Sequence, residues 1–112
     1  MVGECSEGVG SPEFSEMMLR YGSDGEFLRG IEGVPVTVDQ WQLEKLALVT
    51  QKNDVLYAVP GVPQQYQSKV WGRAYAHPQE AVEALCEGLK PGARIAVVPE
   101  GPYVLAGVRV YA

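Results

Sequence analysis

Two short, unbroken apolar runs constrain the fold of this chain more than any other feature. They are Asp54 to Val59 (DVLYAV) and Ala93 to Val98 (ARIAVV), and a turn rich in proline and glycine follows each of them. Strands that are covered on both faces form continuous rather than alternating apolar runs, as is typical of parallel sheets. We therefore expect both runs to be fully buried strands, with helices packed on the sheet.

Segments with a helical spacing of apolar residues separate these runs. Ser11 can cap a helix whose apolar stripe begins at Phe14, and shorter helices are expected around Phe27 and from Gln64 to Val70. A longer helix is expected from about Asp39 to Gln51. A last helix begins at His77-Pro78, and its expected buried stripe consists of Ala81, Val82, Leu85, Cys86 and Leu89.

Three weaker β-like segments complete the pattern. Met1 to Cys5 is typical of the end of a buried strand, Arg73 to Ala76 of a short edge strand, and Tyr103 to Val110 of a last strand. The predicted fold class is α/β, with a small, mainly parallel sheet flanked by helices in three layers, and one domain over residues 1–112. Because the pattern opens inside a strand, we expect the natural polypeptide to continue upstream.

Composition excludes several classes of function. The net charge is −5, the pI is about 4.8, and the nine Lys and Arg residues are scattered, which argues against a nucleic-acid or membrane-surface partner. Two distant cysteines, Cys5 and Cys86, are expected to be buried and reduced, and no signal peptide is evident, so a cytoplasmic location is predicted. The single histidine, His77, cannot form a metal site alone, and we expect it to cap a helix.

The helix expected from Asp39 carries the leading candidate site residues. Gln42 and Lys45 fall on the same helical stripe as Val38 and Val49, and Trp41 adjoins them. A flank that mixes long polar and apolar side chains suits the wall of a cleft, where Gln42 donates hydrogen bonds and Lys45 presents a cation to an anionic group. The residues alone favour a boundary position, where Gln42 is exposed at the rim and Lys45 extends its charged end into solvent.

The turns after the predicted strands supply further candidate cleft residues. In open α/β sheets, ligands bind beyond the carboxyl ends of the strands. Gly8 and Gly10 lie in such a turn before a helix start, where backbone N–H groups favour anions, although a structural tight turn explains the same residues. Glu100 follows a predicted strand between Pro99 and Gly101, with no second carboxylate placed near it by the sequence.

Four segments, in this order and spacing, resemble the C-terminal domain of the LarA family, the nickel-pincer-nucleotide-dependent lactate racemases and related 2-hydroxy acid racemases and epimerases. The resemblance spans essentially the whole chain. It rests on Glu4 to Ser11 with Phe14, Asp39 to Ala47, Glu80 to Leu85 and Ala93 to Gly101.

The resemblance implies a two-domain enzyme whose active site lies between the domains. A Gln and a Lys three residues apart help to line the family's cleft, and Gln42 and Lys45 match that pair in type and spacing. The nickel-pincer nucleotide, the histidine bases, the cofactor-bearing lysine and the histidine nickel ligand belong to the family's N-terminal domain, which this chain lacks. No catalytic residue or metal ligand is therefore expected here, and the expected partners are that N-terminal domain and a small 2-hydroxy acid. The alternative is a non-catalytic small-molecule-binding or oligomerisation module.

Overall fold

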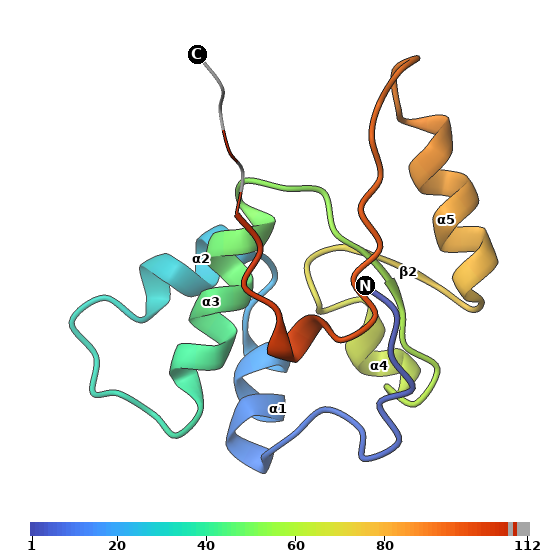
Figure 1. The fold of residues 1–112 in the computed structure, drawn as a ribbon. Coiled ribbons are helices and arrows are strands. Elements are labelled where there is room, and N and C mark those ends of the chain that lie inside the picture. The colour runs from blue at the N-terminus through green and yellow to red at the C-terminus, as the bar shows by residue number, and fades with distance from the viewer. Residues whose placement is uncertain (108, 110–112) are drawn as a thin grey trace.

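The computed structural model describes residues 1–107 and 109 and shows an α/β arrangement of short elements (Figure 1). Helices dominate, and the sheet among the described residues is small. In chain order the elements are α1 (Pro12–Arg20), α2 (Asp24–Gly30), α3 (Gln40–Thr50), β1 (Leu56–Ala58), α4 (Gln64–Gln67), β2 (Arg73–Tyr75), α5 (Pro78–Glu87) and the 3₁₀ helix η1 (Gly101–Tyr103).

Serine side chains fix the starts of the first two helices. The Ser11 hydroxyl accepts a hydrogen bond from the Phe14 N–H at 3.2 Å, and Pro12 occupies the first helical position, where no N–H donor is needed. The Ser23 hydroxyl accepts in the same way from the Glu26 N–H at 3.1 Å. The predicted cap at Ser11 is confirmed.

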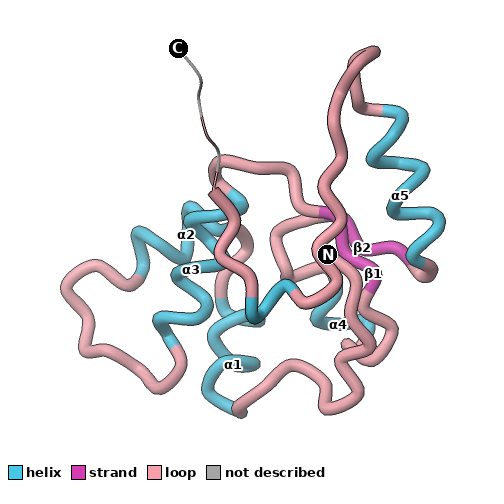
Figure 2. The backbone as a smooth tube through the Cα atoms, in the orientation of Figure 1, coloured by secondary structure: helices cyan, strands magenta, loops and turns pink. Residues whose placement is uncertain are grey.

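The sheet is parallel, as predicted, and both of its strands lie within predicted strands. β1 pairs with β2, with Leu56 opposite Arg73 and Ala58 opposite Tyr75. Met1 to Gly3 runs along the other edge of β1 and forms an isolated parallel bridge between Val2 and Ala58 (Figure 2). There the Ala58 N–H donates to the Met1 carbonyl at 2.9 Å, and the Gly3 N–H donates to the Ala58 carbonyl at 3.1 Å.

The main hydrophobic core lies between the sheet and the helices α1, α2 and α3. Phe27, Met18 and Leu43 are its largest fully buried side chains. The Phe27 ring meets Tyr21 edge-on at a centroid distance of 5.3 Å and lies 5.5 Å from the Trp71 ring. This aromatic contact ties α2 to the end of α1 and to the loop before β2.

The sheet is also covered by α5. Tyr57 and Val59 belong to the main core, whereas Leu56 and Ala58 are buried outside that cluster. α5 contacts β1 and β2, and its buried residue is Ala81. We therefore attribute the burial of Leu56 and Ala58 to α5. The prediction that Asp54 to Val59 contains a strand buried on both faces is confirmed over Leu56–Ala58.

The prediction of a buried strand from Ala93 to Val98 is wrong for this structure. These residues are exposed and lie outside any strand, and among the described residues no hydrogen bond engages the backbone of Arg94 to Val98. β propensity is expressed only when a neighbouring strand supplies the hydrogen bonds and the packing, and no strand in the described part of the chain is paired with this segment. Likewise, Tyr103 ends η1 and residues 104–107 are not strand, while Val108 and Val110 lie outside the described residues.

The predicted buried stripe of α5 is correct only at Ala81. Val82, Leu85, Cys86 and Leu89 are exposed, because no strand from Ala93 to Val98 covers that flank of the helix. Cys86 is therefore an exposed thiol rather than a buried one, while Cys5 is half-buried, and both are unpaired. None of the helices in residues 1–107 and 109 combines the length and apolar character needed to cross a bilayer.

Candidate functional site

The outer face of α3 presents the two leading candidate residues to solvent. Leu43 and Ala47 point into the core, and Gln40 is buried at the helix start with its side-chain oxygen accepting from the Thr37 N–H at 3.1 Å. Gln42 and Lys45 lie on the opposite side and are exposed. Because the buried residues recur at helical spacing, they fix which way the helix faces.

Gln42 and Lys45 differ in whether another side chain of the protein binds them. The Gln42 amide nitrogen donates one of its two hydrogens to the Asp39 carboxylate at 3.1 Å, which leaves its second N–H as a donor and its oxygen as an acceptor. The one side-chain ion pair within residues 1–107 and 109 joins Arg20 to Glu16 at 3.0 Å, so the Lys45 ammonium forms no salt bridge there. Lys45 is thus a cation available to an incoming anion.

Apolar side chains surround this pair on the same face. Trp41 is 63% exposed, and Val38, Leu48 and Val49 are also exposed. Trp41, Leu48 and Val49 lie at three- and four-residue intervals from Gln42 or Lys45 along α3, so they share the flank that carries this pair. Val38, which the sequence places on the same stripe, instead precedes the helix and the left-handed Asp39 at φ +60°. We call Trp41, Gln42, Lys45, Leu48 and Val49 the α3 outer face. A large apolar surface around polar groups is typical of a site that another surface covers.

The glycines of the first turn adopt the conformations that glycine favours. Gly8 has φ +81° and Gly10 has φ +108°, and Cys5 is held at φ +52°, an uncommon value for a non-glycine residue. Gly8 lines an apolar hollow with Val9, Phe14 and residues of β1 and its following loop. The Gly8 N–H donates to the Cys5 carbonyl at 2.9 Å, so it closes the turn, which favours the structural-turn interpretation of Gly8 and Gly10 over a phosphate loop.

The buried hydroxyl of Tyr57 lies at the wall of the same hollow. It donates to the Val70 carbonyl at 3.2 Å, and burial raises the pKa of the Tyr57 phenol above its ordinary value. This hydroxyl therefore remains neutral at physiological pH and serves as a structural donor.

Glu100 is exposed and lies immediately before η1. Its neighbours Pro99 and Gly101 line a second hollow together with Met1, Val2 and Gly3. Gln42 and Lys45 line neither this hollow nor the one at Gly8. The structure therefore supports Gln42, Lys45 and Trp41 as one group, and does not join Gly8, Gly10 or Glu100 to it.

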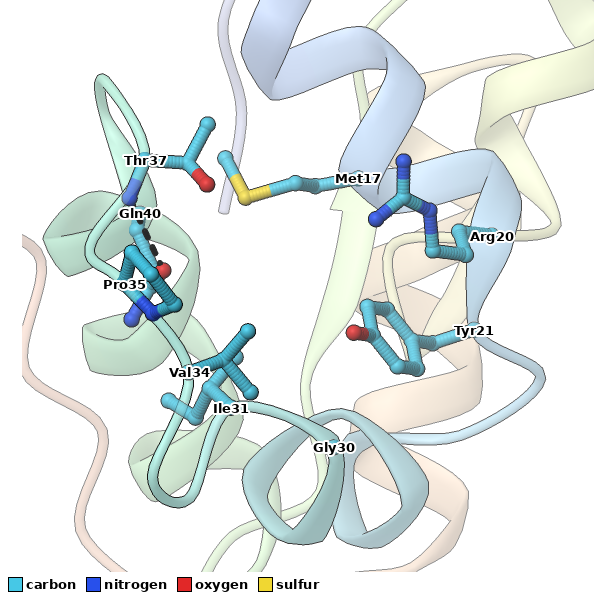
Figure 3. A pocket seen from close by; sticks show the side chains of 9 residues that line it. All are labelled: Met17, Arg20, Tyr21, Gly30, Ile31, Val34, Pro35, Thr37 and Gln40. Carbon is cyan, nitrogen blue, oxygen red and sulfur yellow. Dashed lines mark hydrogen bonds between the residues drawn. The ribbon is translucent and has the colours of Figure 1, made fainter.

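Sequence reasoning did not anticipate a small hollow between α1 and the loop from Ile31 to Thr37 (Figure 3). Arg20 and Tyr21 reach toward it from α1, while Val34 and Thr37 lie on the opposite wall. Arg20 is already paired with Glu16, which offsets its charge. The arrangement is a narrow polar crevice, and its one sequence signal is an Arg-Tyr pair at the end of the first helix.

His77 takes the position expected of a capping residue. It precedes α5, and its backbone N–H donates to the Glu80 carboxylate at 3.3 Å. Within the described residues, no group of three or more His, Cys, Asp or Glu side chains is placed to hold a metal ion. The donor set of this part of the chain does not fit a nickel site.

Comparisons with protein-family models, with curated proteins and with solved structures found no match for this chain.

Proposed function

We propose that this chain is the C-terminal cleft domain of a 2-hydroxy acid racemase or epimerase similar to lactate racemase. The observation that carries the proposal is the α3 outer face, where Gln42 and the unpaired Lys45 lie exposed within an apolar surround. A solvated helix face is normally polar throughout. The mixture found on α3 instead suits a wall that a second domain covers.

The chemistry of the two side chains fits a small hydroxy acid. The Lys45 ammonium offsets the charge of the substrate carboxylate, and the Gln42 amide fixes its orientation through hydrogen bonds. Covering the face removes water from Trp41 and its apolar neighbours, and it lowers the local dielectric constant. Charge–charge attraction between Lys45 and a carboxylate strengthens in such an environment.

The reaction itself is assigned to the N-terminal partner domain. In the family, a nickel-pincer nucleotide supplies hydride transfer, and the described residues of this chain do not fit such a group. The proposal also includes a three-layer single domain and a cytoplasmic location. The burial of Leu56 and Ala58 outside the main core supports a layer of helix on each face of the sheet.

The substitution Lys45→Ala tests the role of the cation. In the complete enzyme, we expect kcat/KM for the hydroxy acid to fall by about tenfold to a hundredfold, the range of a lost charge-assisted hydrogen bond. Initial rates of racemisation, followed by polarimetry, measure this effect. Lys90→Ala is the matched control, because Lys90 is an exposed lysine that follows α5 and lies far from α3 in the sequence. Equal rates for wild type and Lys45→Ala on every hydroxy acid turned over would contradict the assigned role.

A binding or oligomerisation module is the second candidate, and the apolar hollow beside Gly8 is the observation that favours it. Under this function the isolated chain binds its ligand without a partner domain. Calorimetry of the isolated chain with short hydroxy acids and with phosphate separates the two proposals. Half a cleft binds weakly, so tight binding by the isolated chain would favour the module.

A further inference from the structure

We call the segment from Ala93 to Val98 the strap. Its sequence is typical of a strand, but it forms none of a strand's hydrogen bonds in the described part of the structure. Ile95, Val97 and Val98 are exposed, with Val97 at 83%. Among the described residues, no hydrogen bond engages the backbone N–H or C=O groups of Arg94 to Val98. Unpaired backbone of β-branched residues is a template for strand pairing.

A free strand edge lies next to the end of the strap. Met1 and Gly3 use their backbone groups on β1, so the N–H and C=O of Val2, between them, point away from β1. These two groups have no hydrogen-bond partner in the part of the chain that the structure describes. The edge formed by Met1 to Gly3 can therefore accept a further parallel strand.

The end of the strap lies near this edge, at Val98. Figure 1 shows the chain leaving α5 and passing close to the N-terminus, in the direction in which the N-terminal segment itself runs. A hollow separates the two, lined on one side by Met1, Val2 and Gly3 and on the other by Val98, Pro99, Gly101 and Pro102.

The exposed apolar flank of α5 is an independent indication that a strand fills this hollow. Val82 and Leu85 share one arc of α5 with the buried Ala81, and Leu89 follows just after the helix, yet all three are exposed. α5 contacts both β1 and β2, so it lies over the sheet and provides the crossover that a parallel strand after β2 requires. A strand on the Met1 to Gly3 edge would lie beneath this flank.

We propose that the strap closes onto the Met1 to Gly3 edge as a parallel strand, and that this closed state predominates in solution. Closure pairs the free backbone groups of Val2 with the strap and buries Ile95 and Val97 against α5. It also aligns the ends of the strap, the N-terminal segment and β1 at one edge of the sheet. Glu100, which follows the strap, then lies at the same edge of the sheet as the Gly8 turn. The proposal rests on the fold alone and is independent of the proposed function.

Backbone amide exchange in the full chain tests the closed state directly. We expect the amides of Ile95 to Val98 and of Val2 to exchange at least a hundredfold more slowly than unstructured peptide, measured by NMR. Exchange of the strap amides at the rates of unstructured peptide, while Tyr57 and Ala74 in β1 and β2 remain protected, would overturn the proposal.

A pair of charge insertions at residues of equal exposure gives a second test. Val97 is 83% exposed and Val36, which lies in the loop before α3, is 82% exposed. If the strap closes, Val97→Asp lowers the melting temperature by about 5 °C or more, while Val36→Asp leaves it unchanged. Equal melting temperatures for both variants would contradict closure. If Val97→Asp does not fold, exchange in the wild-type chain still decides the question.

Discussion

Replacing Phe27 with alanine is expected to lower the free energy of unfolding by about 3–5 kcal/mol, the range for removing a fully buried aromatic ring. Phe27 has no exposed surface and contacts Tyr21 and Trp71, so its loss leaves a cavity where α2 meets the rest of the core. Domains of this size are stable by only about 5–15 kcal/mol. We therefore expect a large shift in the urea midpoint, measured by circular dichroism.

Tyr103→Ala is the control for this substitution. Tyr103 is another aromatic residue, but it is 88% exposed, so its removal should change stability by less than about 0.5 kcal/mol. A Phe27→Ala protein that unfolds at the wild-type urea concentration would show that the packing of α2 against α1 and Trp71 is not the stabilising centre of this core.

Adding one methyl group at Gly61 is expected to have a comparably large effect. A Cβ atom at this position would lie 2.2 Å from the Cys5 carbonyl oxygen and 2.4 Å from that of Glu4, both of which are backbone atoms. The Gly61 N–H donates to the Glu4 carbonyl at 2.8 Å, so the clash falls on the contact that holds the N-terminal segment against the turn after β1. We expect Gly61→Ala to lower the free energy of unfolding by about 3 kcal/mol, at the upper end for overpacking.

Gly101→Ala is the matched control, since a Cβ there meets no atom within 4 Å. Both variants are compared by urea denaturation. Amide exchange at Gly3 should also accelerate in Gly61→Ala, because its bond to Ala58 depends on the same docked segment. Wild-type stability in Gly61→Ala would mean that residues 1–5 do not pack on this turn.

The elements that the sequence predicts correctly are those with local signals. Ser11 and Pro12 define the start of α1 by capping chemistry, and the apolar run at Leu56–Ala58 marks a strand that is buried on both faces. The parallel pairing of β1 with β2 follows from the intervening crossover. For α1 and β1, the residues within one turn or one strand contain the information needed.

The strap and α5 show where local signals and the structure differ. Ala93 to Val98 has every local property of a buried strand, but a strand forms only when its edge finds a partner, and the structure shows this segment in the open state, without the pairing that we propose for the closed state. The exposed flank of α5 is the same difference seen from the helix, because its expected cover was the strap. For the site, helical spacing correctly predicts that Gln42 and Lys45 share one face, while their surroundings depend on the fold.

The most direct measurement of the central claim is racemisation by reconstituted domains. The chain is mixed with the N-terminal domain of the enzyme, loaded with its nickel-pincer nucleotide, and the optical rotation of a single-enantiomer 2-hydroxy acid such as lactate is followed over time. We expect loss of optical rotation only when both domains are present, and a slower loss with Lys45→Ala than with Lys90→Ala. An unchanged optical rotation in the mixture, despite association of the two domains, would contradict it.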